Sequence, residues 1–238
     1  MNAAATRDNT ARSSARSQVR VLLVEDHVLF AESMELALFV EGYDVRRLAA
    51  PDLSMSPQAL LTAILKIRPR IVLLDLDLGD FGDGVRLVRP LAEAGIDVVV
   101  VSASQDEARR GDALRRGARK VLSKSGPLTE VMATVRRLHQ GLPVMDVVER
   151  ERIISQWYTD HQETADARER LDQLTPRERQ VLGHLMQGRA VGDIAVIGVV
   201  SEATVRTQVK SILAKLDVSS QLAAVGLAHR VQWRPPQV

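Results

Sequence analysis

The sequence contains no cysteine among its 238 residues. This absence excludes a disulfide framework, a thiolate metal site and a cysteine nucleophile. No apolar stretch approaches the roughly 18 residues that would cross a bilayer, so we expect a soluble protein with no membrane partner. Charge of one sign is not in excess either, because 32 Lys and Arg face 30 Asp and Glu. The whole-chain charge therefore gives no strong indication of a nucleic-acid partner.

The length is compatible with two domains, since single domains usually contain roughly 100–200 residues. Residues 1–18 differ from the rest of the chain, because they are rich in Ala, Arg and Ser and nearly lack acids. A transit peptide can have this composition. We favour a disordered tail, because the segment cannot bury enough apolar surface to become ordered.

Residues 19–141 alternate between strand candidates and helical patterns. The strand candidates, in chain order, are VRVLLVEDH, DVRRLAA, IVLLDLD, IDVVVVSAS and KVLSK. Strands that are apolar throughout, each separated from the next by a helix, are typical of a parallel sheet covered on both faces. The pattern predicts an α/β fold with a five-stranded, doubly wound parallel sheet.

In such a sheet the ligand crevice lies beyond the carboxyl ends of the strands. The polar residues found there are Glu25 and Asp26 after the first strand, Asp75 and Asp77 after the third, Ser102 after the fourth and Lys124 after the fifth. Each alone is ordinarily a solvated turn or a cap. Together, the acids repel one another unless a cation lies among them, and an all-oxygen set suits Mg²⁺. The lysine and the serine would then bind phosphoryl oxygens, so the group predicts phosphoryl chemistry at a carboxylate.

The motifs VLLVEDH, VLLDLDL, VVVVSAS and GARKVLSK closely resemble the four signatures of response-regulator receiver domains. The resemblance implies that Asp75 is the phosphoacceptor and that a sensor histidine kinase supplies the phosphoryl group in the cytoplasm. It implies a Mg²⁺ site formed by Glu25, Asp26, Asp75 and the backbone carbonyl of Asp77. It also assigns Ser102 and Lys124 to phosphoryl binding.

Three positions depart from the receiver pattern. Gly79 stands where the family usually has proline, in a loop one residue longer than usual, and Ser125 replaces a proline after the lysine. Val121 stands where the family usually carries an aromatic switch residue. The departure at Gly79 concerns the loop near the metal site, whereas those at Val121 and Ser125 affect signalling more than phosphorylation.

A second interpretation belongs to a different class. The motif DLDLG also resembles the Asp-x-Asp nucleophile motif of haloacid-dehalogenase-type phosphatases. In those enzymes the motif normally lies on the first strand of the domain, whereas here it follows a whole βαβα unit and no cap domain is evident. We therefore favour the receiver over an Asp-nucleophile phosphatase.

Residues 142–172 are expected to link two domains. An apolar stripe of Val147, Ile154 and Tyr158 precedes an almost purely polar stretch of mixed charge. This composition is typical of a connecting helix that frays into a solvated linker.

A helix start follows the linker. In LTPRERQVL, Thr175 can cap the helix, Pro176 suits its first turn, and Glu178 completes a capping box. By propensity, the later segment IAVIGVV reads as a strand. After it, Ser201 caps a helix in which the apolar positions are Val205, Val209, Ile212 and Leu216.

The outward face of this last helix carries Arg206, Thr207 and Lys210. Such a face is ordinarily solvated surface. However, residues 173–232 resemble the LuxR-type helix-turn-helix of the NarL and FixJ regulators, which implies that IAVIG is a scaffold helix. In that family residues 202–215 would form the recognition helix, and the three outward residues would contact DNA.

The same resemblance reveals two local differences. Gly198 replaces a leucine that is usually buried in the scaffold helix, and Ala190 gives that helix no polar cap. The helix-turn-helix unit is therefore expected to be less stable than its relatives.

The sequence thus predicts a five-stranded receiver domain (19–141), a linker helix (142–172), a small all-α helix-turn-helix domain (173–232) and a tail (233–238). We interpret it as a phosphorylation-responsive transcriptional regulator rather than an enzyme. It is expected to bind double-stranded DNA as a homodimer, because one short recognition helix reads too few bases alone. The alternative within the same fold is a regulator that binds DNA without phosphorylation.

Overall fold

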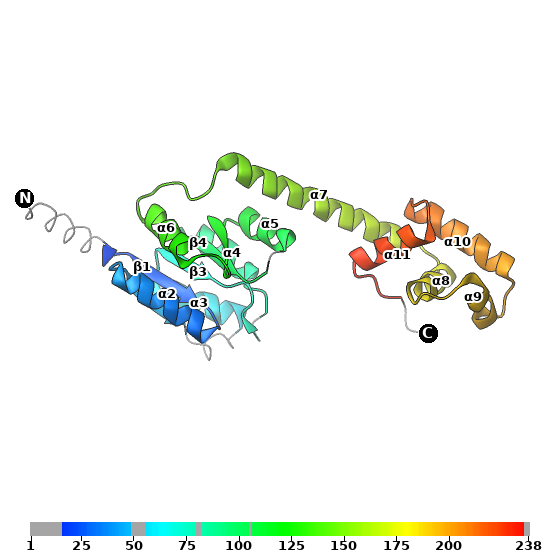
Figure 1. Ribbon diagram of the computed structural model, residues 1–238, viewed down its shortest axis with the longest axis horizontal. Helices are drawn as coiled ribbons and strands as arrows, with labels where there is room; N and C mark the ends of the chain where they lie inside the picture. Colours follow the sequence, from blue (N-terminus) through cyan, green and yellow to red (C-terminus); the bar gives the residue numbers. More distant parts are fainter. Residues whose placement is uncertain (1–15, 49–55, 80–81, 105, 236–238) are drawn as a thin grey trace, which may run out of the picture. The chain divides into compact units, whose positions relative to one another are not determined.

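The computed structural model describes residues 16–48, 56–79, 82–104 and 106–235. The predicted tail at 1–18 lies mostly outside the described residues. The chain divides into two compact units, residues 1–157 and residues 158–238. In Figure 1 the first unit is coloured blue to green and the second mainly yellow to red.

The first unit contains one five-stranded sheet in which all strands are parallel, with the order β2-β1-β3-β4-β5. The strands are β1 (Arg20–Val24), β2 (Asp44–Leu48), β3 (Ile71–Leu74), β4 (Asp97–Ser102) and β5 (Lys120–Ser123). The helices that alternate with them are α2 (Val28–Val40), α3 (Pro57–Ile67), α4 (Val85–Glu93), α5 (Glu107–Arg115) and α6 (Leu128–His139). The predicted doubly wound fold is confirmed.

Successive residues of each central strand enter two different cores. Leu22 and Val24 pack with α3 and α4 on one face of the sheet, whereas Val21 and Leu23 pack with α2 and α6 on the other. Each of these four side chains is fully buried. Burial on both faces explains why β1 is apolar at every position instead of alternating.

Helix α7 (Val147–Asp172) begins in the first unit and continues into the second. The predicted apolar stripe along this helix is wrong, because Val147 and Tyr158 are mostly exposed. In the part of this helix that belongs to the first unit, the buried residue is Ile153, at 8% exposure. Trp157 lies one turn further on, against Gly111 of α5. The helix thus packs on α5 through a face rotated by about one residue from the predicted one.

The second unit is all helical around one core. Its helices are the end of α7, α8 (Pro176–Met186), α9 (Val191–Gly198), α10 (Glu202–Leu216) and α11 (Gln221–Arg230). Ala167 and Leu171 of α7 enter this core. The core also receives Trp233, and Pro235 lies against Gly183.

The helix starts of this unit follow the predicted signals. Thr175 and Glu178 form the expected capping box, and Ser201 caps α10. The predicted stripe Val205, Val209, Ile212 and Leu216 is buried. Segment 191–198 is a helix, so its β propensity is overruled, as the family resemblance implied.

Among the described residues, no single helix has the length and apolar character needed to cross a membrane. Helices α10 and α11 meet the criteria only when taken as a pair, and they are bent by 53°.

Candidate functional site

Acidic residues gather at the carboxyl end of the central strands. Glu25 and Asp75 are almost fully buried, at 3% and 1% exposure. The Asp75 amide donates to the carbonyl of Val24 at 2.9 Å, which aligns the end of β3 with the end of β1. Ligand atoms of Glu25, Asp26, His27 and Asp75 all lie within 4.8 Å of one another. The sheet therefore brings the predicted acids of two strands together.

Lys124 bridges the two buried carboxylates. Its Nζ donates to Glu25 Oε1 and to Asp75 Oδ2, each at 2.7 Å. Burial alone would lower the pKa of Lys124, but the hydrogen bonds to Asp75 and Glu25 outweigh it and raise this pKa. Burial raises the pKa of Glu25, and the hydrogen bonds from Lys124 and His27 oppose this effect in part. The ammonium is thus held charged beside the predicted phosphoacceptor.

The donor set fits a hard divalent cation. The buried Oδ1 of Asp26 has no hydrogen-bond partner among the described residues, although His27 Nδ1 lies 2.8 Å away in a non-hydrogen-bonding alignment. An orphaned buried carboxylate oxygen is costly unless an ion or water satisfies it. Carboxylate oxygens gathered in this way are the kind of ligand that Mg²⁺ prefers. His27 was missed by sequence reasoning, although it directly follows the acid pair.

Ser102 ends β4 at the same edge of the sheet. Its hydroxyl is buried and accepts a hydrogen bond from the Ser104 amide at 3.1 Å. The Lys124 amide donates to the Ser102 carbonyl at 2.9 Å. The ends of β4 and β5 therefore bring the predicted phosphoryl-binding residues side by side.

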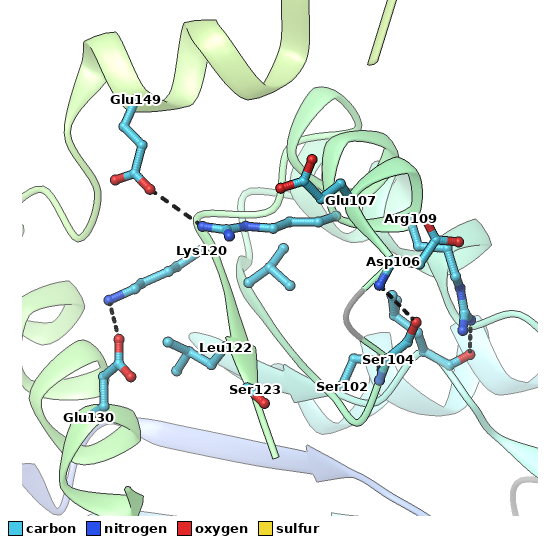
Figure 2. Close-up of a pocket in the computed structure, with 13 residues that line it drawn as sticks. Ser102, Ser104, Asp106, Glu107, Arg109, Lys120, Leu122, Ser123, Glu130 and Glu149 are labelled. Carbon is cyan, nitrogen blue, oxygen red and sulfur yellow. Dashed lines mark hydrogen bonds and ion pairs between the residues drawn. The ribbon is translucent and has the colours of Figure 1, made fainter. Parts of the chain in front are cut away.

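Val121 lines a cavity of about 520 Å³ next to this edge (Figure 2). Its apolar lining also includes Leu76 and Leu122. Around it lie two ion pairs, Arg110 with Glu149 and Lys120 with Glu130. The short valine side chain thus borders open space at the position where the resemblance places an aromatic ring.

Arg109 joins helix α5 to the loop after β3, a contact that the sequence did not indicate. Its Nη1 lies 2.8 Å from Asp77 Oδ1 and its Nη2 lies 3.2 Å from Asp83 Oδ1. Burial alone would lower the pKa of Arg109, but hydrogen bonds to Asp77 and Asp83 raise it. The residue is one of several arginines in EARRGDALRR, and nothing in the sequence distinguishes it from its neighbours.

In the second unit, the exposed face of α10 carries Arg206, Thr207 and Lys210. Arg206 forms an ion pair with Glu202 at 2.9 Å, and its side chain is 70% exposed. The Thr207 hydroxyl donates to the carbonyl of Ala203 at 3.0 Å. The opposite face of α10 is buried in the core, so these polar side chains are available for a partner.

Comparison with known proteins identifies a family for each of the two domains. Residues 21–136 match the response regulator receiver domain, and residues 172–228 match the luxR family of bacterial regulatory proteins. A relative described as a probable transcriptional regulatory protein, NarL of Mycobacterium tuberculosis strain H37Rv, is 30% identical over 215 residues. That match covers 90% of this chain and 94% of the relative. The chain belongs to the response regulators.

Two further similarities have lower identity. The transcriptional regulatory protein LiaR of Bacillus subtilis is 25% identical over 219 residues, covering 89% of this chain and 97% of LiaR. A structure of the RcsB response regulator of Salmonella typhimurium has 21% identity and a TM-score of 0.48, covering 89% of this chain and 98% of that one.

The family architecture decides between the two classes considered for the DLDLG motif. A receiver followed by a LuxR-type domain is the arrangement of DNA-binding transcription regulators, not of enzymes. The motif directly follows β3, the third strand in chain order, and not the first strand. This response regulator is therefore not a phosphatase of the Asp-x-Asp class.

Proposed function

We propose that phosphorylation of Asp75 regulates DNA binding by helix α10. The observation that best supports this proposal is the contact of Lys124 Nζ with both Asp75 and Glu25 at 2.7 Å. From this position the Lys124 ammonium can exchange its hydrogen bond to the carboxylate for one to an incoming phosphoryl oxygen. We propose that the reaction takes place in the cytoplasm and that the donor is a sensor histidine kinase.

The transfer forms one bond and breaks one. A carboxylate oxygen of Asp75 bonds to phosphorus as the bond from phosphorus to the imidazole nitrogen of the kinase histidine breaks. That nitrogen keeps the electron pair. Lys124 and the Ser102 hydroxyl bind the equatorial phosphoryl oxygens and hold the new acyl phosphate in place.

We assign the metal ligands to Glu25, Asp26, Asp75 and the backbone carbonyl of Asp77. The two buried carboxylates and the orphaned oxygen of Asp26 support this set. Bound there, a Mg²⁺ ion would supply positive charge that offsets the charge on the transferred group. Asp77 already contacts the site, because its amide donates to Asp75 Oδ1 at 3.1 Å.

We propose that Arg206, Thr207 and Lys210 contact the major groove of double-stranded DNA. Their exposure on one face of α10 supports this assignment. A helix of 15 residues presents few side chains to bases, so the active form is a homodimer on a two-fold related site. Its half-sites would lie about 10 base pairs apart, or a multiple of this distance.

Intact mass spectrometry tests the phosphoacceptor. The protein is incubated with acetyl phosphate and Mg²⁺, beside Asp75→Asn and Asp77→Asn. One phosphoryl group should be added to the wild type, none to Asp75→Asn, and a partial amount at least to Asp77→Asn. A phosphoryl group added to Asp75→Asn would show that Asp75 is not the phosphoacceptor.

A second candidate function is phosphorylation-independent DNA binding. The cavity beside Val121 favours it, because none of the described residues that line the space next to Ser102 carries an aromatic ring. In that case the acid site would accept phosphate without changing the affinity of the protein for DNA.

A further inference from the structure

Arg109 extends from the first turn of α5 to the loop that follows the phosphoacceptor (Figure 2). Besides its ion pairs with Asp77 and Asp83, its Nη2 donates to the carbonyl of Leu76 at 3.3 Å. One guanidinium therefore binds three acceptors from the two ends of a single loop. A planar fork of donors makes such a contact directional, which a lysine ammonium cannot reproduce.

The loop is closed on itself at the point where Arg109 binds. Asp77 and Asp83 form an antiparallel bridge, and the Gly84 amide donates to the Leu76 carbonyl at 2.8 Å. A Cβ at Gly84 would collide with the Asp75 carbonyl, so the closed loop packs directly on the phosphoacceptor backbone. Movement at Asp75 must therefore reach the groups that Arg109 holds.

The other side of α5 binds the start of α7. Trp157 packs so closely on Gly111 that a Cβ there would lie 2.6 Å from the Trp157 Cβ. The Arg115 guanidinium lies 3.9 Å from the centre of the Trp157 ring. Arg150 donates to the carbonyls of Leu114 and Ala118 at 2.6 Å and 2.7 Å, which satisfies acceptors at the carboxyl end of α5.

Helix α5 thus contacts the loop that follows Asp75 through Arg109, and it contacts α7 through Trp157 and Arg150. We propose that Arg109 is a positioning residue that makes the loop and α5 move together, so that events at Asp75 reach α7. This inference rests on the proposed phosphorylation of Asp75. It provides a route through α5 that does not require an aromatic ring at position 121.

The fluorescence of Trp157 reports this route directly. The chain has two tryptophans, so Trp233→Phe leaves Trp157 as the single emitter. Its emission is followed while Mg²⁺ is titrated and after acetyl phosphate is added, with intact mass measured on the same samples. Emission should change at both steps when Arg109 is present.

The chain offers a matched control at the carboxyl end of the same helix. Arg116 is as exposed as Arg109, at 26% against 27%, and it is also paired to an aspartate, but that partner is Asp112 of α5 itself. Arg116→Gln should keep the Trp157 response. Arg109→Gln should reduce it to about half or less, and Arg109→Lys should do the same because the lysine keeps the charge without the fork.

Asp83→Asn weakens the contact of Arg109 with the loop from the loop side, so it should also reduce the Trp157 response. This variant keeps the test valid if circular dichroism shows that the Arg109 variants fold poorly. A full response in Arg109→Gln, or in Arg109→Lys, would refute the positioning role. So would a phosphorylated wild type with unchanged Trp157 emission. If no phosphoryl mass appears on the wild type, the proposed function itself fails, which the mass measurement separates from failure of the inference.

Discussion

Glu178 links the start of α8 to helix α10, and its replacement by Gln tests how strongly one buried carboxylate stabilises the second unit. Glu178 Oε2 accepts from the Thr175 amide and from Lys215 Nζ, each at 2.7 Å. Its Oε1 accepts from the Ser211 hydroxyl at 2.7 Å. The residue is only 6% exposed, so a change in its charge is not fully screened by water.

The pKa of Glu178 sets the expected magnitude. Burial alone would raise this pKa, but the hydrogen bonds from Lys215, Ser211 and Thr175 lower it to about 2 from an ordinary value of 4.5. Because lowering a pKa by one corresponds to about 1.4 kcal/mol, the ionised carboxylate contributes at most about 3 kcal/mol to folding. Glu178→Gln keeps the shape and loses the charge, so we expect a loss of about 2–3 kcal/mol at pH 7.

The sign of the pH dependence follows from the lowered pKa. A carboxyl whose folded pKa lies below its unfolded pKa stabilises the protein fully above the unfolded value. This stabilisation is lost as the pH falls toward the folded value. The difference in unfolding free energy between wild type and Glu178→Gln should therefore narrow by about 1.4 kcal/mol between pH 7 and pH 3.5.

Urea unfolding followed by Trp233 fluorescence provides the measurement. Trp233 packs on the core of the second unit, and Trp157→Phe removes the other emitter. The control is Glu202→Gln, which breaks an exposed ion pair with Arg206 and should cost less than about 1 kcal/mol. A difference between wild type and Glu178→Gln that stays constant down to pH 3.5 would show that the carboxylate does not act through its charge.

Other consequences can be measured independently. Arg206→Ala or Lys210→Ala should weaken DNA binding by roughly 1–3 kcal/mol where a base is contacted, or lower the salt slope by about one unit where a phosphate is contacted. If the double variant with both substitutions keeps its fold and its affinity for DNA, the exposed face of α10 does not contact DNA. A short valine at position 121 cannot move into the space left by a movement of Ser102, as an aromatic ring could. Phosphorylation should therefore change DNA affinity only several-fold at fixed salt. A change of about a hundredfold or more would contradict this expectation. Val199 follows α9 with a left-handed φ of 52°, which is strained for a valine. Val199→Gly should therefore raise the unfolding free energy by roughly 1 kcal/mol in the same urea assay. A loss of stability would show that the valine side chain stabilises the protein by more than the backbone strain costs.

The acid site could be predicted because it depends on strand topology more than on side-chain detail. Once the strands are parallel, their carboxyl ends share one edge. With β1 beside β3 in the strand order, Glu25 and Asp75 are neighbours there, and the long side chain of Lys124 reaches them from β5. Arg109 could not be predicted in this way. Which arginine of an Arg-rich helix reaches a loop depends on the rotation of α5 on the sheet, and the sequence does not specify that rotation.

The linker and the scaffold helix show two other limits of sequence reasoning. In α7 the neighbours Ile153 and Ile154 fit an apolar stripe equally well by sequence, but the structure buries only Ile153 of the two. In α9 the β-branched residues favour a strand, but an isolated strand in an all-helical unit has no neighbour for its backbone. Burial of Ile194 and Ala195 in the helical core decides the conformation.

The end of α9 shows how packing can compensate for a residue that the family pattern lacks. A glycine at position 198, where the family resemblance implies a buried leucine, suggests a cavity. Instead, Arg177 of α8 occupies this space, and a Cβ at Gly198 would collide with its guanidinium. Arg177 Nη2 also donates to the Gly198 carbonyl at 3.1 Å, at a helix end where carbonyls otherwise lack partners and the dipole favours positive charge. The missing leucine is therefore replaced by an interaction of a different kind, so its absence does not by itself imply an empty core.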